Sequence, residues 1–182
     1  MNEVIFTTIH GSHLYGLATP FSDVDTFTVT TSHNTRAHQR VRGNDDQTTM
    51  GLDTFLEYAY TGSHQSVEAL FSPFKVWHSH EYLAPMLDGM RVGGPDVLAK
   101  YQRTVTKFAH ADDFKRRRHA CRLWLNMQAL RSDGRFSPRM TPAEISWATE
   151  VATSDTDRDM LALLLMEGSS ALGDFLRDEI PA

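Results

Sequence analysis

Cysteine is scarce in this chain and long apolar runs are absent. Cys121 is the one cysteine among 182 residues, which excludes an internal disulfide and leaves no set of thiolates for a metal cluster. No apolar run approaches the length of about 18 to 20 residues needed to cross a bilayer, so we expect a soluble protein with no membrane contact. The first residues lack the basic segment and long apolar stretch of a secretion signal, and we therefore expect a cytoplasmic protein.

Basic residues are outnumbered by acidic ones. The 18 lysines and arginines against 23 aspartates and glutamates give a formal net charge of -5, which argues against a protein that coats nucleic acid. A local basic patch remains in the sequence KRRRH at 115–119. With 41% hydrophobic residues, a chain of this length can bury one core, which we expect two lobes to share.

The β-strand signals lie in the first 60 residues. We predict strands at 3–9 and 24–31, which are rich in β-branched and aromatic residues, and a third strand at 47–52. The polar segment between the second and third strands, 32–46, is predicted to be a loop or a short excursion. These segments predict a small β-sheet carried by the N-terminal part of the chain.

Helical periodicity follows from residue 52 onward. Apolar residues recur three and four positions apart, and small residues, prolines at first turns and a capping box mark the helix ends. The order of strands before helices predicts an α+β fold, with a catalytic lobe at 1–93 and a helical lobe at 94–182. The predicted helices run from Leu52 to Gly62, from Ser63 to Phe71, from Pro95, through the basic sequence at 115–126, from the TPAE box at 141–144, and from 157 to 176.

A small-residue turn precedes two acidic residues in the sequence GSHLYGLATPFSDVD at 11–25. Asp23 and Asp25 are two residues apart at a predicted strand, so their side chains point to the same face and can share a divalent cation. Such oxygen ligands suit Mg²⁺, which binds through one or two carboxylates, waters and substrate phosphates. Gly11 and Ser12 allow backbone N–H groups and a hydroxyl to approach a phosphate. The pattern favours metal-assisted phosphoryl transfer, and the alternative is a hairpin turn before a solvated strand.

The basic sequence at 115–126 carries a polar stripe. Its apolar neighbours lie about a quarter turn away, so we expect the stripe at the edge of the core, where the residues of a cleft lie. A lysine, a histidine and an arginine on one line suit the phosphates of a nucleotide or of an RNA end. The alternative is a solvated helix face, which we expect for the arginines at 116–118. Spacings of 4, 3 and 4 residues place the stripe on one helix face: Lys115, His119, Arg122 and Asn126.

The sequence GSHLYGLATPFSDVDTFTV resembles the signature of the polymerase-β-like nucleotidyltransferase superfamily, in which Gly-Ser precedes an Asp-x-Asp pair on a strand. Its form GS-x-x-YGLATP-x-SD-x-D resembles more narrowly the predicted nucleotidyltransferases associated with RNA repair in bacteria and phages. The segment at 45–73, KRRRHACRL at 115–123 and GRFSPRM at 134–140 resemble further parts of that group. The resemblance implies a small mixed β-sheet core like the polymerase-β palm, followed by a C-terminal helical lobe.

The resemblance also implies a set of site residues. A third carboxylate on a neighbouring strand would join Asp23 and Asp25 to hold two Mg²⁺ or Mn²⁺ ions. Asp46 is favoured for it over Asp45, which would face the opposite side of a regular strand. The group has an acidic residue at Glu68, which is either an exposed helix position or a participant in catalysis. The implied nucleotide-binding residues are Gly11, Ser12, Ser22, Lys115, His119 and Arg122.

The implied reaction moves a nucleoside monophosphate from an NTP to a hydroxyl acceptor and releases pyrophosphate. The acceptor oxygen would attack the α-phosphorus, and Asp46 would help to remove its proton. The likeness to the RNA-repair group makes an RNA 3′ end, such as that of a tRNA, the expected acceptor. Transfer to a protein hydroxyl and a non-catalytic nucleotide- or RNA-binding module are the alternatives. The base preference and the oligomeric state stay open.

Overall fold

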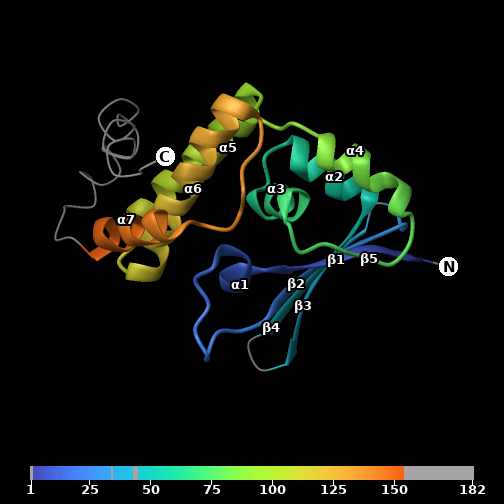
Figure 1. Ribbon diagram of the computed structural model, residues 1–182, viewed down its shortest axis with the longest axis horizontal. Helices are drawn as coiled ribbons and strands as arrows, with labels where there is room; N and C mark the ends of the chain where they lie inside the picture. The colour runs from blue at the N-terminus through green and yellow to red at the C-terminus, as the bar shows by residue number, and fades with distance from the viewer. Residues whose placement is uncertain (1, 34, 43–44, 154–182) are drawn as a thin grey trace.

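A five-stranded sheet in the order β3-β4-β2-β1-β5 forms the N-terminal part of the computed structural model (Figure 1), which describes residues 2–33, 35–42 and 45–153. Its strands are β1 (Val4–His10), β2 (Asp25–Thr30), β3 (Arg36–Arg42), β4 (Asp45–Gly51) and β5 (Val76–Trp77). Parallel pairing of β2 with β4 and antiparallel pairing of the other neighbours make the sheet mixed. The predicted α+β fold is confirmed.

The strand β3 is the main difference from the sequence prediction. The polar segment at 32–46 is predicted to be a loop or a short excursion, but its residues 36–42 form a strand that pairs antiparallel with β4, from Arg36 opposite Met50 to Arg40 opposite Asp46. β3 lies at the edge of the sheet, where backbone hydrogen bonds hold a strand without an apolar alternation in its sequence. The three predicted strands correspond to β1, β2 and β4, with ends shifted by one or two residues.

Five helices begin at or next to their predicted starts, whereas the helices at 11–15 and 84–89 and the 3-10 helix at 81–83 are not among the predicted ones. The helices are α1 (Gly11–Tyr15), α2 (Leu52–Tyr60), α3 (His64–Phe71), α4 (Ala84–Gly89), α5 (Pro95–Ala109), α6 (Phe114–Asp133) and α7 (Pro142–Thr153), with the 3-10 helix η1 (Glu81–Leu83) before α4. The capping box of α7 is formed, because Thr141 N donates to Glu144 Oε2 at 2.7 Å and Glu144 N donates to Thr141 Oγ1 at 3.3 Å. The predicted helix at 157–176 lies outside the described residues.

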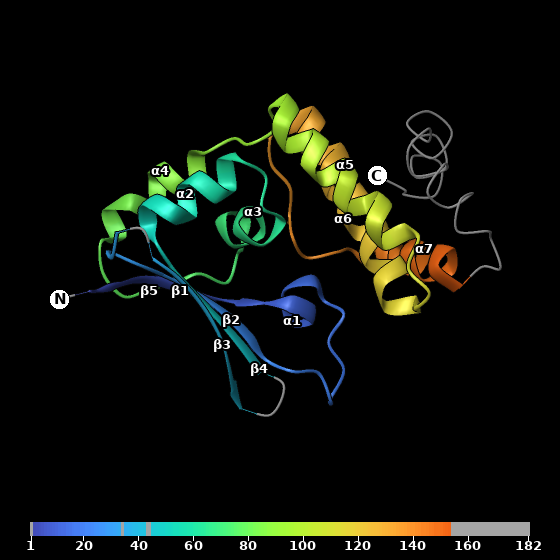
Figure 2. The same ribbon diagram turned by 180° about the vertical axis from the view of Figure 1, so that it is seen from behind.

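The helices form two groups around the sheet. α2 and α4 cover one face, and α5, α6 and α7 pack together beside it (Figures 1 and 2). Phe55 of α2 contacts Phe6 of β1 and Phe27 of β2 edge to face, with ring centroids 5.7 and 5.9 Å apart. One apolar core continues from these rings to Trp147 of α7, and the division into lobes at residue 93 stays a prediction. Among the described helices, none has both the length and the hydropathy of a membrane-spanning segment.

Candidate functional site

The ends of three neighbouring strands lie together at one end of the sheet. His10, the last residue of β1, pairs with Asp25, the first residue of β2. The parallel register of β2 and β4 pairs Thr26 with Gln47, so Asp25 lies beside Asp46 at the start of β4. The topology therefore brings the glycine-serine turn after β1 close to carboxylates from two different strands.

Gly11 and Asp25 fit against each other where β1 leads into α1. Gly11 has φ +63°, a left-handed conformation that residues with a side chain rarely adopt. A Cβ on Gly11 would also collide with Asp25 Oδ2. The other carboxylate oxygen, Oδ1, accepts a hydrogen bond of 3.1 Å from the backbone N of Asp46. The absence of a side chain at position 11 is therefore what allows this carboxylate to lie against the turn.

The sheet register distinguishes the two candidates for the third carboxylate. Asp46 lies beside Asp25, and side chains of neighbouring residues on paired strands point to the same face. Asp45 instead accepts a hydrogen bond of 2.8 Å from the backbone N of Val24, which ties it to the loop before β2. The register supports Asp46 over Asp45, and a role of Asp46 in a reaction stays a prediction.

A cavity of about 810 Å³ opens at this end of the sheet. Its lining comes from the turn into α1, the loop between α1 and β2, the start of α3 and the start of α6. The cavity brings together all the predicted site residues except Asp46 and Arg122. Those that line it are Gly11, Ser12, Ser22, Asp23, Asp25, Lys115 and His119.

The first turns of α6 make their side of the cavity basic. Lys115, Arg116 and Arg118 line it together, and Lys115 and Arg116 are exposed. Asp113 caps the helix by accepting a hydrogen bond of 2.8 Å from Arg116 N, which fixes the turn that carries these cations. The sequence predicts a merely solvated face for residues 116–118, but two of these arginines face the cavity.

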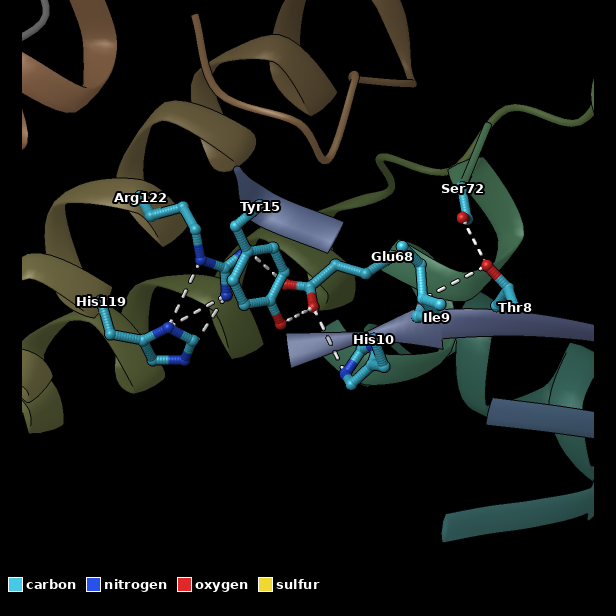
Figure 3. A network of polar contacts seen from close by, with 8 residues as sticks. All are labelled: Thr8, Ile9, His10, Tyr15, Glu68, Ser72, His119 and Arg122. Atoms are coloured by element: carbon cyan, nitrogen blue, oxygen red, sulfur yellow. Dashed lines mark hydrogen bonds and ion pairs between the residues drawn. The ribbon is translucent and has the colours of Figure 1, made fainter. Parts of the chain in front are cut away.

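Arg122 does not line the cavity, in contrast to the predicted nucleotide contact. Its side chain is 1% exposed, and Nη1 donates to Glu68 Oε1 at 2.8 Å (Figure 3). The guanidinium also lies over the ring of Tyr15, 3.6 Å from the centroid. The polar stripe of α6 lines the cavity as far as His119, and beyond that residue it is buried in the core. Arg122 therefore supports the wall of the cavity from behind and does not offer its charge to a ligand.

Glu68 is the centre of a buried polar network (Figure 3). The side chain is fully buried, so the alternative of an exposed helix position is wrong. Its Oε2 accepts a hydrogen bond of 2.6 Å from Tyr15 Oη and lies 3.7 Å from His10 Nε2. Burial alone would raise the pKa of Glu68, but Arg122, the nearby His64 and His10 and the hydrogen bond from Tyr15 together outweigh burial and lower this pKa to about 2. The network connects α1, α3 and α6 directly behind the cavity.

Three histidines line the cavity: His10, His64 and His119. Burial lowers the pKa of each of them, and nearby Arg122 helps to lower that of His119 to about 2. Arg122 Nη2 lies 3.0 Å from His119 Nδ1, and a guanidinium has only hydrogens to donate. The three rings are therefore neutral at pH 7. Among the described residues, the positive charge of the cavity comes from the lysine and arginines of α6.

Among the cavity residues that the sequence motifs do not select, four carry aromatic rings: His10, Tyr15, Phe21 and His64. His10 directly precedes the glycine-serine turn and Tyr15 ends the short helix after it, so proximity to the motif is a signal for both. Phe21 stands two residues before the first motif aspartate, so proximity to the motif could also have identified it. His64 belongs to a distant helix, and no local pattern marks it.

The donor set fits a cation that protein and substrate hold together. Asp23 and Asp25 both line the cavity, and Mg²⁺ commonly takes one or two carboxylates and completes its shell with waters and phosphates. In the part of the chain that the structure describes, no three His, Cys, Asp or Glu side chains are grouped to hold a metal ion. Asp46 therefore does not complete the predicted three-carboxylate site in this structure. The two aspartates suit Mg²⁺ or Mn²⁺ delivered with a nucleotide.

Comparisons with known proteins give distant similarity to solved structures alone. No family model matches the chain, and no curated protein matches it. Among solved structures, it is similar to a nucleotidyltransferase-like protein from Exiguobacterium sibiricum, with 11% sequence identity and a TM-score of 0.36 over 97% of this chain and 70% of that chain. The sequence identity and the TM-score are both low, so this similarity assigns no function to the chain.

Proposed function

We propose that this protein is a metal-dependent nucleotidyltransferase, which moves a nucleoside monophosphate from an NTP to a hydroxyl acceptor and releases pyrophosphate. The observation that carries this proposal is the cavity, which combines Asp23 and Asp25, the Gly11-Ser12 turn and the basic start of α6. A triphosphate is a polyanion, so it requires direct cationic contacts and a divalent cation. The basic part of the cavity can supply the cationic contacts, and its acidic part can hold the divalent cation.

The cationic residues of α6 bind the triphosphate in this proposal. Lys115 and Arg116 are exposed and Arg118 lines the same surface, and Arg116 would exchange its ion pair with Asp113 for a phosphate oxygen. Ser12 offers a hydroxyl, and Gly11 lets the Asp25 carboxylate lie against the turn beside it. A divalent cation held by Asp23 and Asp25 would supply charge neutralisation at the reacting phosphate.

The reaction requires the acceptor hydroxyl to lose its proton. The acceptor oxygen bonds to the α-phosphorus, the bond from this phosphorus to the oxygen that bridges to the β-phosphorus breaks, and pyrophosphate leaves. We propose Asp46 as the base that takes the proton, because it lies beside Asp25 in the sheet register. Its side chain does not line the cavity in this structure, so it would turn toward the acceptor when substrate binds. In this arrangement residues 1–93 form the catalytic lobe, and the helical lobe at 94–182 supplies the basic side of the site.

We propose an RNA 3′ end, such as that of a tRNA, as the acceptor. This choice rests on the resemblance of the sequences at 11–25 and 115–123 to the RNA-repair group. The experiment incubates the protein with Mg²⁺, each α-labelled NTP in turn, and either total RNA or a protein lysate. Label in RNA supports the proposal, and label in protein would move the activity to a protein hydroxyl. Tight NTP binding without transfer to either would leave a non-catalytic binding module.

A further inference from the structure

Phe21 is the most exposed large apolar side chain of the described residues, with 95% of its surface accessible. It lines the cavity two residues before Asp23, so its ring lies at the cavity mouth. Single exposed apolar residues are common on protein surfaces and need no function. The position of Phe21 is therefore more informative than its exposure.

A hydrogen-bonded turn at 19–22 holds Phe21 in this outward position. Ser22 N donates to Thr19 O at 3.0 Å, and Thr19 N donates to Ser22 Oγ at 2.8 Å. Phe21 N itself donates to Thr19 Oγ1 at 3.3 Å, and Pro20 restricts the backbone before it. The turn fixes the backbone at Phe21, so a ligand that covers the ring has to order only the side chain.

We propose that Phe21 is a stacking surface for a nucleobase at the mouth of the cavity. This inference rests on the proposed function, which places phosphates near Asp23, Asp25 and the start of α6. A nucleotide held there by its phosphates carries a flat base that needs an apolar contact, and an aromatic ring supplies one for any base. The base belongs to the bound NTP or to the terminal nucleotide of the acceptor, and both present the same π face.

The test compares three ligands in the presence of Mg²⁺: ATP, inorganic tripolyphosphate and a short single-stranded oligoribonucleotide. Phe21→Ala is expected to weaken binding of a base-containing ligand about tenfold, the size of one lost base stack, and to leave tripolyphosphate binding unchanged. Phe21→Trp is expected to retain binding and to show quenching of its fluorescence by the base. Tyr82→Ala is the matched control, because Tyr82 is 74% exposed and lies outside the cavity.

The outcomes separate this inference from the proposed function. Weaker ATP binding by Phe21→Ala assigns the stack to the NTP, and weaker oligoribonucleotide binding alone assigns it to the acceptor. Unchanged binding of both, with wild-type affinity for tripolyphosphate, overturns the role of Phe21 and leaves the proposed function standing. A wild-type protein that binds neither ATP nor tripolyphosphate overturns both.

Discussion

Glu68 and Arg122 form an ion pair in which Oε1 and Nη1 are 2.8 Å apart and the two side chains are 0% and 1% exposed. The pair links α3, which packs with the sheet part of the molecule, to α6, which carries the basic side of the cavity. Tyr15 contacts both partners, by its hydroxyl and by its ring. The relative position of the acidic and basic sides of the site therefore depends on this pair.

Loss of the charge on Glu68 should destabilise the fold. Glu68→Gln leaves the Arg122 guanidinium buried without a counter-charge, and breaking a buried pair in this way costs about 3 to 5 kcal/mol. Urea unfolding measures the change in the free energy of unfolding. Glu57→Gln is the control at an exposed position of α2 and should stay within about 0.5 kcal/mol of wild type. Similar stability of both variants would contradict the structural role of the pair.

A methyl group at Gly11 should reduce the rate of nucleotide transfer by more than the strain of the positive φ alone explains. Gly11→Ala carries the cost of a positive φ and also pushes Asp25 Oδ2 away from the turn. Gly16→Ala separates the two effects, because Gly16 has φ +78° but a Cβ there meets nothing nearer than 3.7 Å. Initial rates and melting temperatures should show comparable losses of stability and a much larger loss of transfer in Gly11→Ala. Equal transfer rates in the two variants would refute the contact.

Removal of the Lys115 charge should weaken NTP binding without disturbing the fold. Lys115 is exposed and lines the cavity, so Lys115→Ala should raise KM for NTP about tenfold, as expected for one charge-assisted contact. The melting temperature should not change. Lys107→Ala, which removes an exposed lysine of α5 outside the cavity, should leave KM at the wild-type value. If the two lysine variants behave alike, the start of α6 is a solvated face.

Acidification should destabilise the protein in part through His119. The pKa of His119 is lowered in the folded protein, whereas an unfolded histidine binds a proton below about pH 6.5. The unfolded chain then holds the additional proton, so stability falls as the pH falls below 6.5. His119→Asn should show a shallower loss of unfolding free energy from pH 7 to pH 5. His78→Asn, at an exposed position outside the cavity, is the matched control, and an equal slope in wild type and His119→Asn would contradict a neutral buried His119.

The sequence predicts the parts of this molecule that depend on neighbouring residues. The strands at the motif follow from local alternation, and the helix starts at Pro95 and Pro142 follow from proline and capping signals. The closeness of Gly11 to Asp25 comes from the pairing of β1 with β2, which no local pattern specifies. β3 escapes prediction because an edge strand is held by backbone pairing and needs no apolar alternation. The burial of Arg122 could not be predicted, because helical spacing shows which residues share a face but not how deeply that face is buried.

Asp25 provides the most direct test of the central claim, that this cavity catalyses nucleotide transfer. Asp25→Asn preserves the size of the side chain and an oxygen that can accept the hydrogen bond from Asp46 N, but it removes the charge needed for a divalent cation. The measurement is the initial rate of label transfer from α-labelled NTP with saturating Mg²⁺. We expect a wild-type melting temperature and a rate at least about 100-fold lower in the variant. A folded Asp25→Asn protein that transfers label at the wild-type rate would contradict the proposed site.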